Sequence, residues 1–198
     1  MNLLHIDSSI LGDGSASRAL TRGIVARLRA AQPELQVTYR DLAAEPLPHY
    51  SAASIAGSEP EMAKRDAGVL QEFLAADVLV LGAPLYNFSL PSQLKAWIDR
   101  ISINGKTFRY TAKGPEGLAG NKKVIVAIAR GGVYEAGAGA EFGESYLKLL
   151  FGFLGVKEVS FVRAEGLHVS PEQREASLRA AQAQIHALPA PAAAALAA

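Results

Sequence analysis

The sequence predicts an α/β domain in which helices cover both faces of a doubly wound, five-stranded parallel sheet. Strand-like and helix-like segments alternate along the chain, and several strand-like segments are nearly continuous apolar runs, typical of parallel strands buried on both faces. A chain of 198 residues, 49% hydrophobic and 20% charged, is large enough to bury one such core. We therefore expect one domain over residues 1–188 and an Ala- and Pro-rich tail over 189–198.

The order of elements follows from hydrophobic periodicity and from the residues that start and stop helices. Ser170 is placed as an N-cap before Pro171, with Gln173 positioned to complete a capping box, and Gly155 is placed to end the preceding helix. Residues 105–123 interrupt the alternation, so we expect a hairpin or a long loop there. The expected strands are 2–7, 35–42, 77–84, 122–129 and 158–167, and the expected helices are about 15–31, 59–76, 91–103, 143–154 and 171–187.

Charge and composition exclude several classes of partner and site. The net charge is +1 and the basic residues are scattered, which argues against nucleic acid or an anionic membrane as a partner. No apolar run approaches about 18 residues, and the N-terminus lacks the pattern of a signal peptide, so we expect a cytoplasmic protein. Cysteine is absent and the four histidines have no metal-like spacing, so we expect no metal site.

Ligands of such sheets bind beyond the carboxyl ends of the strands, so the loop after the first strand is a candidate site. It lacks the third glycine of a dinucleotide fingerprint and the Gly-Lys-Ser/Thr of a P-loop. It does carry hydroxyls at Ser9, Ser15 and Ser17, close to glycines and to the expected start of a helix. Hydroxyls and free helix N–H groups together favour a phosphate. The alternative is an ordinary serine N-cap with solvated neighbours.

Two further loops reach the same edge of the predicted sheet. Gly131 and Gly132 follow a buried strand, where bare backbone allows close approach of a flat ligand, although a strand-ending turn explains the pair better when it is taken alone. Tyr86, Asn87 and Phe88 follow the neighbouring strand. The alternative for this triplet is an Asx-turn closed by the asparagine, with the aromatic rings packed into 105–123. A phosphate-bearing flat heterocycle would explain all three loops.

The chain resembles the FMN-dependent NADH:quinone oxidoreductases, also called FMN-dependent NADH-azoreductases, over essentially its whole length before the tail. The resemblance implies a flavodoxin-like fold, one FMN per subunit, NADH as donor, and quinones or azo compounds as acceptors in a ping-pong reaction. It also implies a homodimer with flavin sites at the subunit interface. The motifs that carry it are "SSIL" (8–11), "SAS" (15–17), "RDLAAEPLP" (40–48), "APLYNFSLPSQLKAWID" (83–99), "TFRYTAKGPEGL" (107–118), "ARGG" (129–132) and "FVRAEG" (161–166).

The resemblance also implies roles for individual positions. Those matching Ser9, Ser15, Ala16 and Ser17 bind the FMN phosphate. The positions that hold the ribityl chain and the ring system match Leu85, Tyr86, Asn87, Phe88, Ala129, Arg130, Gly131 and Gly132. We assign no catalytic residue, because the flavin carries the chemistry.

Three departures from the family pattern concern the range of substrates more than flavin binding. Leu85 stands where methionine is frequent, Ala129 where a hydroxyl residue is frequent, and Tyr134 where histidine occurs. We expect Tyr134 and Phe153 in the substrate pocket. The alternatives are a non-enzymatic flavodoxin-like electron carrier, although this chain lacks the acidity of such carriers, and a flavin reductase that supplies reduced FMN to a partner.

Overall fold

A computed structural model describes residues 1–134 and 142–189 and has the expected five-stranded parallel sheet at its centre. Its strand order is β2-β1-β3-β6-β7, and each neighbouring pair is parallel. The central strand β3 is buried along its whole length, as its apolar sequence predicts. The strands are β1 (Asn2–Asp7), β2 (Gln36–Asp41), β3 (Val78–Pro84), β6 (Lys123–Ala129) and β7 (Glu158–Ala164).

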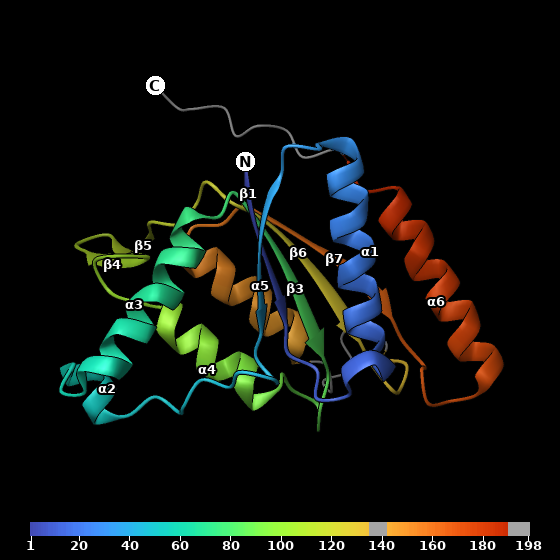
Figure 1. Ribbon diagram of the computed structural model, residues 1–198, viewed down its shortest axis with the longest axis horizontal. Coiled ribbons are helices and arrows are strands. Elements are labelled where there is room, and N and C mark those ends of the chain that lie inside the picture. The colour runs from blue at the N-terminus through green and yellow to red at the C-terminus, as the bar shows by residue number, and fades with distance from the viewer. Residues whose placement is uncertain (135–141, 190–198) are drawn as a thin grey trace.

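The helices form two layers, one on each face of the sheet (Figure 1). One layer consists of α1 (Ala16–Ala31) and α6 (Pro171–His186), and the other of α3 (Pro60–Ala75), α4 (Ser92–Ile101) and α5 (Gly143–Phe153). Each layer buries its own apolar cluster against the sheet. Trp97 is fully buried in the second cluster and meets Phe73 edge to face, so it is a packing residue.

The predicted helix ends are largely confirmed. Ser170 caps α6 by accepting a hydrogen bond from the backbone N–H of Gln173, and Pro171 opens the helix. The reciprocal bond of a capping box does not form, because the Gln173 side chain packs beside Gly166 instead. Gly155 follows α5 with φ +91°, the left-handed conformation that glycine adopts without strain.

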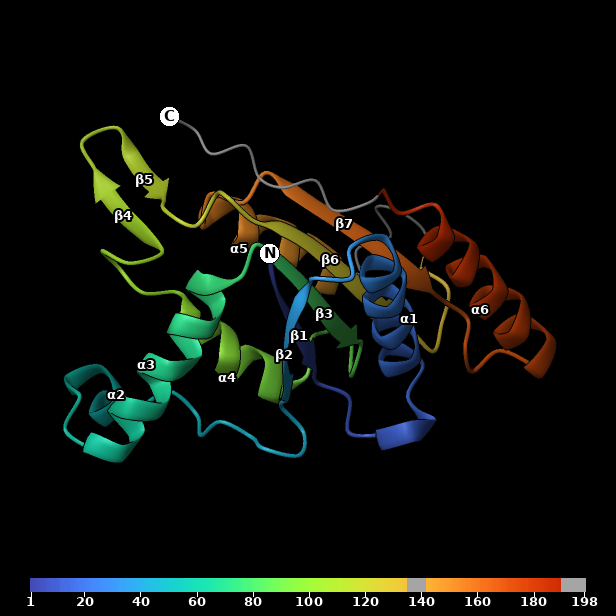
Figure 2. The same ribbon diagram turned by 45° about the horizontal axis from the view of Figure 1, so that its top comes forward.

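The interruption at 105–123 contains an antiparallel hairpin of β4 (Phe108–Thr111) and β5 (Gly114–Gly117), which projects from the sheet in Figure 2. Two short elements were not expected, the 3-10 turn η1 (Gly12–Gly14) and α2 (Ala52–Ala56). The expected strand 158–167 ends earlier, at Ala164, and the backbone N–H groups of Gly166 and Leu167 donate to the loop after β6. Residues 190–198 of the expected tail lie outside the described part of the chain.

Within the described ranges no helix combines the length and the hydropathy that a membrane span requires.

Candidate functional site

The carboxyl ends of β1, β3 and β6 meet at one edge of the sheet, where η1 and the start of α1 also lie (Figure 1). A cavity of about 100 Å³ opens there. Nine of the residues that the sequence assigns to a cofactor line it: Ser9, Ser15, Ala16, Ser17, Leu85, Tyr86, Ala129, Arg130 and Gly131. The loops after β1, β3 and β6 therefore converge, as parallel-sheet topology requires.

The serine turn, residues 15–17, forms one wall of the cavity. Ser15 is the N-cap of α1 and accepts from the backbone N–H of Arg18 at 3.3 Å, so the N-cap alternative is correct as a description of this residue. Its hydroxyl also lies 3.1 Å from that of Ser17. In the described part of the chain nothing accepts from the N–H groups of Ala16 and Ser17. The turn thus combines two hydroxyls with open helix N–H groups, which suits an anion.

Tyr86 connects the loop after β3 to the loop after β1. Its hydroxyl lies 3.1 Å from that of Ser9 and accepts from the backbone N–H of Ile10 at 3.2 Å. Two backbone hydrogen bonds between Tyr86 and Ser89 close a tight turn around Asn87 and Phe88. The position of the Ser9 hydroxyl therefore depends on the turn that carries Asn87.

Both central residues of this turn have positive φ, 49° at Asn87 and 68° at Phe88, as in a type I′ turn. Asparagine tolerates this conformation, but for phenylalanine it costs roughly 1–2 kcal/mol. The amide of Asn87 makes no hydrogen bond to any described residue, and Phe88 is 56% exposed. Phe88 meets Tyr134 edge to face at 6.5 Å and does not pack into the hairpin. The structure therefore shows neither an Asx-turn closed by the Asn87 side chain nor aromatic rings of the triplet packed into 105–123.

The loop after β6 presents bare backbone at the cavity. A Cβ on Gly131 would lie 2.9 Å from Nδ1 of His168, and one on Gly132 would lie 3.5 Å from the ring of Tyr134. The side chain of Arg130 is buried and donates to Glu165 at 2.7 Å and to Glu144 at 3.3 Å. Arg130 therefore borders the cavity, while its charge is used to anchor the loop to α5 and to the segment after β7.

Glu144 is the centre of this ionic cluster. Burial alone would raise the pKa of its carboxyl, but hydrogen bonds from Arg163 and Lys148 outweigh that effect and lower the pKa to about 2. The cluster fixes the start of α5 next to the glycine pair.

A second ionic cluster lies beneath the loop after β1. Arg18 pairs with Asp41 and donates to the backbone carbonyl of Ser9. Hydrogen bonds from Arg18 lower the pKa of Asp41. The Tyr39 hydroxyl donates to Asp7, and burial together with the charges of Asp7 and Asp41 raises the pKa of Tyr39 to about 12. These groups support the loop without lining the cavity.

Some expected residues lie at the rim or elsewhere. Asn87, Phe88, Gly132 and Tyr134 border the cavity without lining it. Phe153 lies at the far end of α5, where its ring packs 4.6 Å from that of Phe108 in the hairpin. Within one chain the structure does not bring Phe153 to the cavity, and its role there stays a prediction.

The sequence reasoning missed six residues that line the cavity, namely Leu11, Gly14, Pro84, Leu167, His168 and Arg174. Three of them follow the last strand, whose carboxyl end reaches the same edge of the sheet. The topological rule that selected the other loops would have selected this one.

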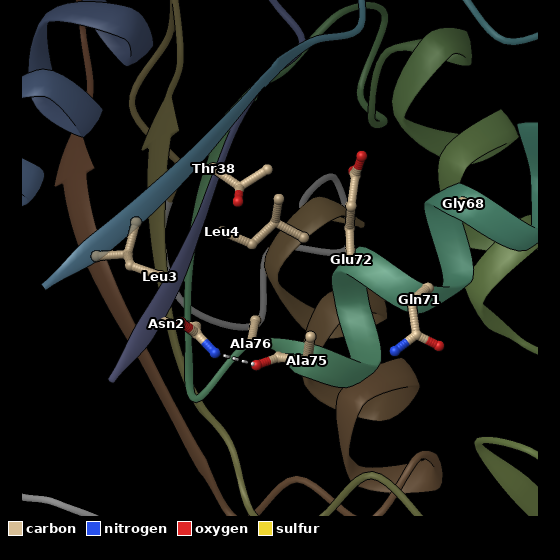
Figure 3. A pocket seen from close by; sticks show the side chains of 9 residues that line it. All are labelled: Asn2, Leu3, Leu4, Thr38, Gly68, Gln71, Glu72, Ala75 and Ala76. Atoms are coloured by element: carbon tan, nitrogen blue, oxygen red, sulfur yellow. Dashed lines mark hydrogen bonds between the residues drawn. The ribbon is translucent and has the colours of Figure 1, made fainter.

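A larger cavity, of about 410 Å³, lies between α3 and the strands β1 and β2 (Figure 3). Its lining includes Asn2, whose side chain donates to the carbonyl of Ala75, and Glu72, which is paired with Arg40. None of the sequence-predicted site residues lines it. Nor, within the described ranges, is any group of three His, Cys, Asp or Glu side chains arranged to hold a metal.

Comparison with known proteins identifies the family. A model of the flavodoxin-like fold matches residues 1–188. The chain is 54% identical over 187 residues to an FMN-dependent NADH:quinone oxidoreductase of Xanthomonas oryzae pv. oryzae, covering 94% of this chain and 96% of that protein. A Xanthomonas campestris pv. campestris protein of the same name is 56% identical over 203 residues, covering 96% and 100%. The chain belongs to the FMN-dependent NADH:quinone oxidoreductase family.

Solved structures agree with membership of this oxidoreductase family. An azoreductase from Bacillus anthracis superposes with a TM-score of 0.85 at 32% identity, covering 94% of this chain and 97% of that one. An FMN-dependent NADH-azoreductase from the same species, solved in complex with FMN, gives a TM-score of 0.83 at 25% identity, covering 93% and 96%.

The residues around the cavity fit a phosphate-bearing flat ligand. The serine turn offers hydroxyl and N–H donors, and no described residue that lines the cavity carries a carboxylate. The rim is apolar and open, with Leu11, Phe88 and Val133 each more than half exposed. A ligand that covered these side chains would remove apolar surface from water.

Proposed function

We propose that this protein is an FMN-dependent oxidoreductase that uses NADH to reduce quinones, and aromatic azo compounds, by two electrons at a time. The observation that carries the proposal is the meeting of the serine turn, Tyr86 and Gly131 in one cavity at the carboxyl edge of the sheet. The names of the relatives at 54% and 56% identity support the same activity.

In this proposal two sets of residues hold two different parts of the cofactor, its phosphate and its ring system. Ser9, Ser15 and Ser17, with the open N–H groups at the start of α1, hold the phosphate. Asn87 donates to the polar edge of the ring, and Gly131 with Gly132 allows close approach from the other loop. FMN supplies the hydride-accepting and electron-donating chemistry, so the chain needs no nucleophile.

Donor and acceptor are proposed to use one binding face in turn, which gives a ping-pong reaction. Phe88 and Tyr134 stand edge to face beside the glycine pair and offer aromatic surface to a nicotinamide or a quinone. Tyr134 therefore becomes a residue that sets the range of acceptors. Replacing it with histidine is expected to change the relative rates with different quinones and to leave FMN affinity unaltered.

A homodimer is proposed to complete the site. The cavity of about 100 Å³ is smaller than the roughly 300–1,000 Å³ of pockets that enclose a whole ligand. Exposed apolar side chains at its edge, Ile10, Leu11, Phe88 and Val133, give a second copy a surface to cover. Phe153 would reach a cofactor across such an interface. Sedimentation of the flavin-loaded protein tests this, and an active monomer would refute it. The cytoplasmic location stays a prediction from the sequence.

Binding of FMN and of riboflavin tests the proposed phosphate site. Wild-type protein stripped of flavin should bind FMN far more tightly than riboflavin, which lacks the phosphate. Ser17→Ala should weaken FMN binding roughly tenfold, because one hydrogen bond to a dianion is lost, and should leave riboflavin binding unchanged. Equal affinities of the wild type for FMN and riboflavin would rule the site out.

A further inference from the structure

Arg174 lines the same cavity as the serine turn although it comes from α6, at the other end of the chain. It is partly buried. Its guanidinium makes no hydrogen bond or ion pair with any residue in 1–134 or 142–189. An arginine has five N–H donors and a permanent positive charge, so this residue brings unused binding capacity to the cavity.

Helix packing explains how Arg174 reaches the level of the serine turn. Helices α1 and α6 lie side by side on one face of the sheet and both begin at its carboxyl edge (Figure 1). Gly23 of α1 faces Gln182 and Ile185 of α6. Ser15 lies eight residues before Gly23, and Arg174 lies eight residues before Gln182. Because both helices rise by about 1.5 Å per residue, Ser15 and Arg174 stand at about the same height.

The charges around the cavity leave a role that Arg174 is placed to fill. A phosphate monoester is close to a dianion at neutral pH, whereas the serine turn offers only neutral donors. The other arginine that lines the cavity, Arg130, already donates to Glu144 and Glu165. No carboxylate occurs among the described lining residues, so none competes for Arg174 there.

We propose that Arg174 supplies the counter-charge for the phosphate of the bound flavin nucleotide, across the cavity from the serine turn. This inference rests on the proposed function, since it assumes that the cavity takes the FMN phosphate. It adds a specific ligand to that function, an α6 arginine that distinguishes phosphorylated from unphosphorylated flavin. The serine turn orients the phosphate, and Arg174 neutralises its charge.

Flavin binding to the stripped protein, followed by fluorescence quenching, tests the proposal without measuring turnover. Arg174→Gln should raise the Kd for FMN about tenfold and leave the Kd for riboflavin unchanged, because only FMN carries the charge. Arg174→Lys keeps the charge and should recover part of the loss. Arg179→Gln, five residues further along α6 at an exposed arginine paired with Glu175, is the matched control and should alter neither Kd.

Each outcome decides the proposal. An unchanged FMN affinity in Arg174→Gln overturns it, and so does an equal loss for FMN and riboflavin, which would mean that Arg174 supports the fold or the ring. If the wild type itself fails to prefer FMN over riboflavin, the proposed phosphate site fails together with this inference. A wild-type preference for FMN that survives in Arg174→Gln leaves the proposed function standing and removes only Arg174 from it.

Discussion

Arg18 and Asp41 form a bidentate ion pair with N···O distances of 2.6 and 2.7 Å, and the same guanidinium donates to the backbone carbonyl of Ser9 at 2.8 Å. Asp41 ends β2 and Arg18 lies in the first turn of α1, so the pair connects the edge strand to the loop that faces the cavity. The position of Ser9 is thereby fixed by two side chains that do not line the cavity.

Arg18→Lys should separate this positioning role from general stability. Lysine keeps the charge, but it cannot form a bidentate pair with Asp41 and also reach the Ser9 carbonyl. We therefore expect the free energy of unfolding to fall by about 1–3 kcal/mol. FMN affinity should also fall severalfold, and more than riboflavin affinity.

The matched control for Arg18→Lys is Arg40→Lys. Arg40 forms a similar bidentate pair with Glu72, at 2.9 and 2.7 Å, and neither residue lines the cavity that holds the serine turn. This variant should lose stability, because its pair is also broken, and keep wild-type FMN affinity. Equal FMN affinities in the two variants would contradict the positioning role of Arg18.

Asn87→Gly tests whether the triplet after β3 serves the flavin. Glycine adopts the observed φ of 49° readily and keeps the turn, while the amide is removed. We expect the melting temperature of the flavin-free protein to change little, and FMN binding and flavin reduction by NADH to weaken. If flavin-free stability falls while flavin affinity and reduction rate stay at wild-type values, the asparagine is architectural.

The strand pattern and the serine loop could be predicted because both depend on local signals. Continuous apolar runs identify buried parallel strands, and parallel topology then brings their carboxyl ends together. The turn at 86–89 could not be predicted, since phenylalanine is uncommon in left-handed turns, yet Phe88 has a φ of 68°. The place of Arg174 depends on how α6 packs against Gly23, a contact between distant parts of the sequence.

The hairpin offers a further prediction about stability, because it docks on the end of α5 by close backbone contact. A Cβ on Gly117 would lie 2.0 Å from the backbone nitrogen of Gly155, which no side-chain movement relieves. Gly117→Ala should therefore lower the free energy of unfolding by about 3 kcal/mol or more. Gly152→Ala, in the same region, has nothing within 4 Å of the added Cβ and should raise stability by roughly 0.5–1 kcal/mol. Chemical denaturation of both variants measures the contrast.

The lowered pKa of Glu144 predicts that this carboxyl contributes to the loss of stability in acid. The pKa of Glu144 is about 2 in the folded protein, against 4.5 for an unperturbed glutamate, so its ionised form stabilises the fold above about pH 4.5. That contribution should fall steadily as the pH drops from 4.5 towards 2. Glu144→Gln should be less stable than the wild type at pH 7, and the difference should shrink over that interval. A difference that stays constant from pH 7 to pH 2 would contradict the role of the charge.

Anaerobic titration of the FMN-loaded protein with NADH, followed by a quinone or an azo dye, tests the proposed activity most directly. We expect one equivalent of NADH per flavin to remove the absorbance of the oxidised flavin, and the acceptor to restore it with no protein partner present. A parallel titration with NADPH would determine the preference between donors. Failure of NADH to reduce the bound flavin would contradict the proposed activity. A reduced flavin that passes its electrons to neither acceptor would also contradict it, as expected of an electron carrier or of a supplier of reduced FMN.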